Sequence, residues 1–85
     1  MRGRKESFWT QVVKAWVMRA WNGGPQEVEM LERDRAIALQ KKVGKVVQEL
    51  KRNRSIEGGE VGTSIEARAG GWVVRINKLE WRMEG

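Results

Sequence analysis

The chain lacks cysteine, histidine and tyrosine, and it contains a single proline. Without cysteine there is neither a disulfide framework nor a thiolate metal site. Without histidine as well, a zinc site would depend on carboxylates alone, and the most common catalytic bases and nucleophiles are missing. Neither a Walker A motif nor G-x-G-x-x-G occurs among the glycines. The sequence therefore predicts a protein that is not an enzyme and that uses no metal or other cofactor.

Long apolar runs are missing too. The longest near the start, from Val12 to Met18, is interrupted by Lys14 and is far too short to span a bilayer. No uninterrupted apolar region follows the basic N-terminus, as it would in a signal peptide. We therefore expect a cytoplasmic protein. Its 85 residues, 40% of them apolar and 33% charged, suit one small globular domain.

Positive charge is what the chain has in excess, with a net charge of +6. About +4 falls on residues 1–22 and about +5 on residues 41–55, whereas residues 23–40 carry about −2 and residues 56–85 about −1. Basic proteins favour polyanionic partners, above all nucleic acid.

The N-terminal half predicts two helices. Residues 6–22 repeat apolar side chains at the helical period, with Ser7 as a suitable N-cap. The segment NGGP, residues 22–25, ends this helix. The second helix is expected over residues 25–53, because acidic residues occupy its first turns and basic residues its last.

The length of this second helix points to a homodimer. A straight helix over residues 25–53 would be ~42 Å long at ~1.5 Å per residue. One small domain hardly covers such a length by itself. Either the helix breaks, near residues 33–35 or at Gly44, or a second copy of the chain packs against it.

The C-terminal part predicts a β-hairpin over residues 61–82, with the turn at Gly70–Gly71. Pairing outward from this turn places apolar residues on one face and sets Glu66 opposite Arg75 on the other. The predicted fold is thus α+β: two N-terminal helices, the second long and either continuous or broken near residues 33–35 or 44, packed on a C-terminal hairpin.

If the second helix breaks, the order helix–helix–helix–hairpin is analogous to that of winged-helix DNA-binding domains. Residues 41–53 would then be the recognition helix and the hairpin the wing. The short strand that normally follows the first helix has no counterpart in this prediction. The analogy rests on element order alone.

The stretch QKKVGKVVQELKRNR, residues 40–54, carries the candidate site. Its valines and Leu50 fill one side of a helical wheel, and four polar residues fall on the opposite side. Cations at this spacing suit the phosphates of a nucleic acid backbone and give little sequence readout. An alternative is that they form an ordinary solvated helix face. The predicted contacts are Lys41, Lys42, Lys45, Gln48, Lys51, Arg52 and Arg54, extended by Arg2, Arg4 and Lys5 in a flexible basic arm, residues 1–5.

Two other binding functions compete with this hypothesis. Trp9, Trp16 and Trp72 lie on apolar faces and are predicted core residues, whereas other large apolar residues fall off those faces. These residues predict an oligomer contact, or an inhibitor or adaptor that binds another protein. They are Trp21, Leu79, Trp81 and Met83.

The third possibility is a membrane surface, because residues 2–21 combine basic and aromatic side chains as interfacial helices do. It is disfavoured, since the core needs the same apolar face. The sequence does not choose between RNA and DNA or between single and double strands. A short chain without an enzyme signature is typical of an accessory or viral protein.

Overall fold

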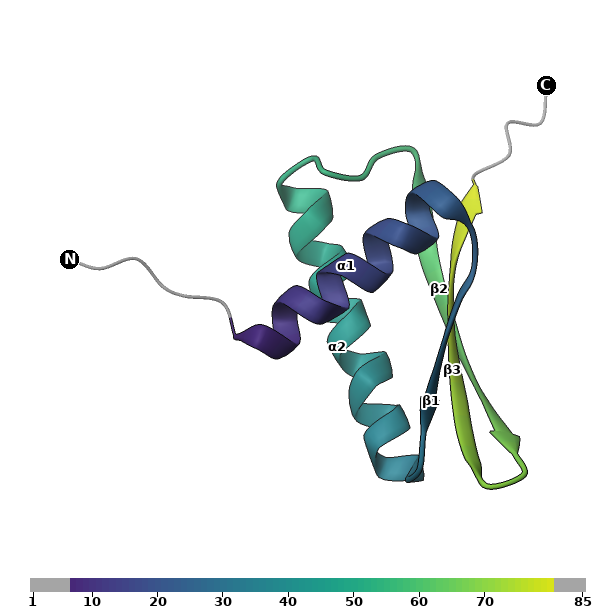
Figure 1. The fold of residues 1–85 in the computed structure, drawn as a ribbon. Coiled ribbons are helices and arrows are strands. Elements are labelled where there is room, and N and C mark those ends of the chain that lie inside the picture. The colour runs from purple at the N-terminus through teal and green to yellow at the C-terminus, as the bar shows by residue number, and fades with distance from the viewer. Residues whose placement is uncertain (1–6, 81–85) are drawn as a thin grey trace.

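A computed structural model describes residues 7–80, which form two helices and a three-stranded antiparallel sheet (Figure 1). The strand order in the sheet is β1-β3-β2, so the last strand along the chain lies in the middle. Both helices cover the same face of the sheet (Figure 1). The predicted α+β class is confirmed. The elements are α1 (Phe8–Gly23), β1 (Gln26–Met30), α2 (Arg33–Arg52), β2 (Gly59–Arg68) and β3 (Gly71–Glu80).

Helix α1 begins at Phe8, directly after the predicted N-cap Ser7. The Ser7 side chain accepts a hydrogen bond of 3.1 Å from the backbone N–H of Thr10, which satisfies a donor that the first turn leaves free. Val13, Val17 and Ala20 are fully buried against α2 and the sheet. The apolar face of α1 therefore belongs to the core over its central and C-terminal turns.

The prediction of one helix over residues 25–53 is wrong at its start. Residues 26–30 form strand β1, and α2 begins at Arg33 and continues without a break through Gly44 to Arg52. At ~1.5 Å per residue, α2 is ~30 Å long. The sheet and α1 cover its apolar face, so the argument for a dimer from helix length no longer holds.

The hairpin is confirmed, but its register is shifted by two residues. Arg68 pairs with Gly71, and the turn consists of Ala69 and Gly70, whose positive φ of 85° favours glycine. Arg75 therefore lies opposite Ser64, and the predicted Glu66–Arg75 pair does not form as direct neighbours. A shift of two residues leaves every side chain on its predicted face, because side chains alternate along a strand.

Position 71, the first residue of β3, requires glycine for a steric reason. A Cβ atom at this position would lie 2.6 Å from the carbonyl oxygen of Met30 in the neighbouring strand β1. The close approach of β1 to β3 therefore requires a residue without a side chain.

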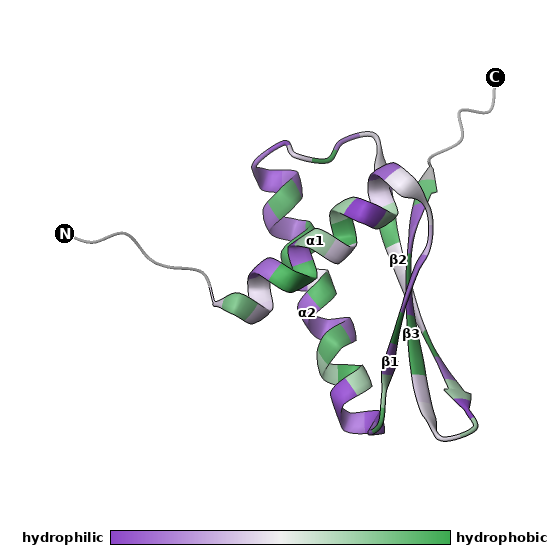
Figure 2. Ribbon diagram, viewed as in Figure 1, coloured by the Kyte–Doolittle hydropathy of each residue, from purple (hydrophilic) through white to green (hydrophobic). Residues whose placement is uncertain are grey.

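The core lies between the helices and the sheet. Leu39 of α2 is fully buried, as are Val74 and Ile76 of β3, and Ile56 closes the end of the core from the loop before β2. Figure 2 shows apolar and polar residues alternating around α2. This alternation fixes which face of the helix is left for solvent.

Candidate nucleic-acid interface

The basic face of α2 lies on the exposed side of the helix, as its spacing predicts. We define the basic strip as Lys41, Lys45, Gln48 and Arg52, all four of which are exposed. The strip extends over ~17 Å at ~1.5 Å per residue. It is held there by the opposite side of the helix, where every side chain is buried against α1 or the sheet. These residues are Ala36, Leu39, Val43, Val46, Val47 and Leu50.

The cations of the basic strip form no ion pair with the described part of the chain. In residues 7–80, no carboxylate lies within 4 Å of the charged ends of Lys41, Lys45 or Arg52. Lys41 and Lys45 are one helical turn apart, a spacing at which like charges destabilise a helix by about 0.2–0.5 kcal/mol. Among the described residues, the strip is therefore a row of positive charges without ion-pair partners.

Other predicted contacts have different surroundings. Lys51 Nζ lies 2.6 Å from Glu60 Oε2 of β2, and the hydrogen bond from Lys51 holds the pKa of Glu60 below its ordinary value. Lys42 is half-buried, and Arg54 is exposed beyond the end of α2 with a positive φ of 62°. The structure thus places Lys51 in an internal ion pair.

Three predicted contacts of the N-terminal arm, Arg2, Arg4 and Lys5, lie outside the described residues. The same is true of Trp81 and Met83, which were predicted to form a partner or oligomer interface. The structure therefore assigns no place to these five residues.

The burial of the tryptophans differs from the prediction. Trp21 is half-buried: its ring packs against the core beside Gly59, and Lys78 Nζ lies 4.4 Å from the ring centroid. Trp9 is 40% exposed and so is not a core residue, although its ring meets that of Trp16 edge-on at 5.9 Å. Trp16 is partly buried and packs against the core.

Of the four residues predicted to bind a partner, Trp21 and Leu79 lie in the described part of the chain. Of these two, Leu79 is the exposed one. Its side chain is 48% exposed on the sheet face that the helices leave open. Phe8, at 80% exposure, is another exposed apolar residue, at the N-terminal end of α1.

Sequence reasoning missed a charged network on the open sheet face. Arg75 of β3 donates two hydrogen bonds to Glu27 Oε2 of β1, at 3.2 Å and 2.7 Å. This interaction lowers the pKa of Glu27 and raises the pKa of Arg75. Arg68 lies 3.4 Å from Glu66 and 3.9 Å from Glu27. No sequence signal reveals the network, because it depends on the pairing of β1 with β3.

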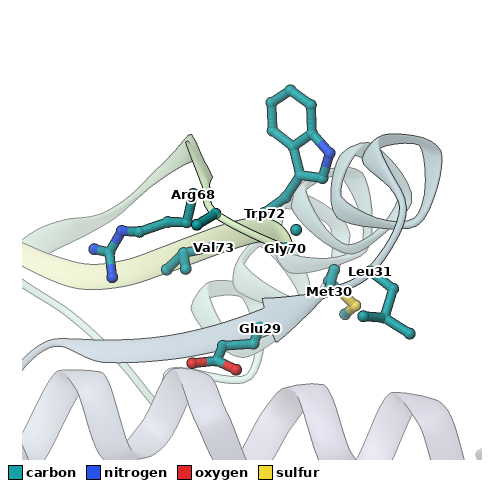
Figure 3. Close-up of a pocket in the computed structure, with 9 residues that line it drawn as sticks. Glu29, Met30, Leu31, Arg68, Gly70, Trp72 and Val73 are labelled. Carbon is teal, nitrogen blue, oxygen red and sulfur yellow. The ribbon is translucent and has the colours of Figure 1, made fainter.

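A hollow of about 440 Å³ lies where the hairpin turn meets the end of β1 (Figure 3). Glu29, Leu31, Arg68 and Trp72 are among the residues that line it, and the ring of Trp72 points away from Glu29 (Figure 3). Arg68 is already paired with carboxylates of the sheet. Residues 7–80 contain no group of three acidic side chains placed to hold a metal ion. The hollow thus contains no such acidic group.

Comparisons of the chain with protein-family models, curated proteins and solved structures gave no match. Neither α1 nor α2 is long and apolar enough to cross a membrane.

Proposed function

We propose that the protein binds nucleic acid without catalysis, by docking the basic strip of α2 on the phosphate backbone. The observation that carries the proposal is the row formed by Lys41, Lys45 and Arg52, exposed and without a carboxylate within 4 Å in residues 7–80. By contrast, the open sheet face pairs its arginines with glutamates. Within residues 7–80, Lys41, Lys45 and Arg52 thus form a row of cations on one helix without ion-pair partners.

Phosphates suit this row on energetic grounds. A bound polyanion would replace the repulsion between neighbouring cations by attraction and would release its condensed counterions. Gln48, between Lys45 and Arg52, can donate a hydrogen bond to a phosphate oxygen. Most of these contacts position the protein and carry no sequence information. We therefore propose binding with weak sequence preference. We further propose that the protein acts in the cytoplasm and without a cofactor.

The fold offers α2 as a docking element. A helix lies immediately before the hairpin, as in winged-helix domains, although this fold has one helix fewer and its α2 is unbroken. The major groove of B-DNA, ~12 Å wide, admits an α-helix, whereas that of A-form RNA is too narrow for side chains to read. If the protein prefers a duplex, we expect DNA to bind more tightly than RNA.

The test is fluorescence anisotropy with labelled single- and double-stranded RNA and DNA across a salt series. Three phosphate contacts predict a slope of about −2.7 in log K against log salt. Raising the salt from about 50 to about 200 mM should therefore weaken binding roughly 40-fold. The variant Lys41→Gln/Lys45→Gln/Arg52→Gln should lose this contribution and keep its fold, because all three side chains point away from the core.

The matched control is Arg19→Gln/Arg33→Gln/Arg35→Gln, which removes the same charge from exposed positions outside the strip. It should retain most of the affinity. Equal losses in the two variants would show that net charge matters and the strip does not. Unchanged binding by the strip variant would refute the proposed interface.

A protein-binding module remains a second proposal because Leu79 is exposed on the open sheet face. Its ligand would bind with weak salt dependence, and Leu79→Ser would reduce binding while the strip variant would not. Absence of nucleic acid binding at low salt would favour this function over the first.

A further inference from the structure

Gly44 is an interior residue of α2 that the helix itself does not require. The helix continues through this position, and the φ of Gly44 is not positive, so the backbone uses none of the conformational freedom of glycine. The residue is exposed, and no atom of the described chain lies within 4 Å of the position its Cβ would occupy. Because glycine destabilises the interior of a helix relative to alanine, its presence here points to a role outside the fold.

The neighbours of Gly44 on the helix surface belong to the basic strip. Residues three and four positions apart lie next to each other on a helix, so Lys41 flanks Gly44 on one side and Gln48 on the other. Lys45 is the next residue along the chain, and neither Lys41 nor Lys45 has a carboxylate within 4 Å in residues 7–80. Gly44 therefore leaves a gap between the side chains of Lys41 and Gln48, which we call the Gly44 notch.

We infer that the Gly44 notch receives a phosphate group of the bound nucleic acid, which approaches the helix backbone between Lys41 and Gln48. This inference rests on the proposed function and adds to it the place where the phosphate chain crosses α2. The charges select the occupant: an anion in the notch is attracted by Lys41 and Lys45, whereas a second copy of α2 would bring like charges together. The ammonium group of Lys41 and the amide of Gln48 can each donate a hydrogen bond to a phosphate oxygen.

The side of the notch toward the sheet is polar as well. Gln40, one turn before Gly44, donates a hydrogen bond of 3.1 Å from its Nε2 to Thr63 Oγ1 of β2. Because the Thr63 oxygen accepts this bond, the proton of its hydroxyl can be donated to another acceptor. Strand β2 thus places a further hydrogen-bond donor beside the turn of α2 that leads to the notch.

The experiment compares Gly44→Ala and Gly44→Leu with the wild-type chain, by thermal unfolding and by anisotropy with the same labelled RNA and DNA. Both changes leave the charge unaltered and extend into open space. Gly44→Ala should raise the melting temperature by about 2–8 °C, because alanine is the better helix former. Both variants should nevertheless bind more weakly, in order of side-chain size, and Gly44→Leu should lose at least roughly tenfold in affinity, or about 1.4 kcal/mol. A glycine without a role in binding would give the first effect and not the second.

The matched control is Gly23→Leu. Gly23, the last residue of α1, is also exposed, and no atom of the described chain lies within 4 Å of its Cβ position. The affinity of this variant should stay within about twofold of the wild type, because the position lies outside the basic strip. Equal losses in Gly23→Leu and Gly44→Leu would overturn the assignment of the notch.

The remaining outcomes separate this inference from the proposed function. If the wild type binds and the strip variant does not, while both Gly44 variants bind like the wild type, the notch is wrong and the basic strip stands. If the wild type binds no nucleic acid, both are wrong. Polyglutamate of equal charge serves as a competitor. If it bound as tightly as nucleic acid and lost as much affinity in Gly44→Leu, the notch would fit carboxylates of an acidic protein, which would overturn its assignment to phosphate.

Discussion

Replacement of Gly71 by alanine should destabilise the fold through a backbone collision. The added Cβ would lie 2.6 Å from the Met30 carbonyl oxygen, whereas ordinary contacts begin at 3.4 Å, so β1 must move by about 0.8 Å. The obstacle is the backbone of a paired strand, which no side-chain rotation relieves. Overpacking of this kind destabilises proteins by about 1–3 kcal/mol. At roughly 4–8 °C per kcal/mol for a domain of this size, the melting temperature should fall by about 4–24 °C.

Gly62→Ala is the matched control, measured by the same thermal and urea unfolding. Its Cβ would lie 2.9 Å from Leu79 Cδ1, a contact nearly as short, but Leu79 is 48% exposed and its side chain can rotate away. The free energy of unfolding should therefore change by less than about 0.5 kcal/mol. Amide exchange in β1 should accelerate in Gly71→Ala alone. If the two variants were equally stable, the close approach of β1 to β3 would not be what requires glycine.

Two further predictions concern the core and the ion pairs. Leu39→Ala should lower the free energy of unfolding by about 2–5 kcal/mol in urea titrations, since Leu39 is fully buried, and a loss below 1 kcal/mol would place this side chain outside the core. The pKa values of Glu27 and Glu60 are lowered from an ordinary value of 4.5 by hydrogen bonds from Arg75 and Lys51, so their contribution is complete above pH 4.5 and is lost as the pH falls through the lowered values. The double variant Glu27→Gln/Glu60→Gln should therefore show a smaller loss of stability on acidification than the wild type, and equal losses would contradict this origin.

Periodicity in the sequence was sufficient to predict α1, the buried side of α2 and the two faces of the hairpin. In each case one element carries enough apolar residues to reveal its own period. The basic strip followed from the same argument, because a helix that buries Val43 and Val47 must expose Lys41 and Lys45. Whether the strip binds nucleic acid remains a prediction.

Strand β1 could not be recognised in this way. Its five residues, QEVEM, contain only two apolar side chains, Val28 and Met30, and its glutamates also fit the first turns of a helix. What decides its conformation is pairing with β3, more than forty residues away in the chain. The same pairing explains why Gly71 belongs to a strand, which a local search for turn residues does not reveal.

The central position of β3 also governs how the sheet can form. Within residues 7–80, both β1 and β2 pair with β3 alone, and both precede it in the chain, so neither has this partner until β3 has been synthesised. The contact between Glu27 and Arg75 closes a separation of 48 residues, the kind of non-local contact that slows folding. During synthesis the helices can form first, while the segments that become β1 and β2 remain unpaired and prone to aggregate until β3 is made. A cut in the Ala69–Gly70 turn that let β3 dissociate would therefore dismantle the whole sheet at once.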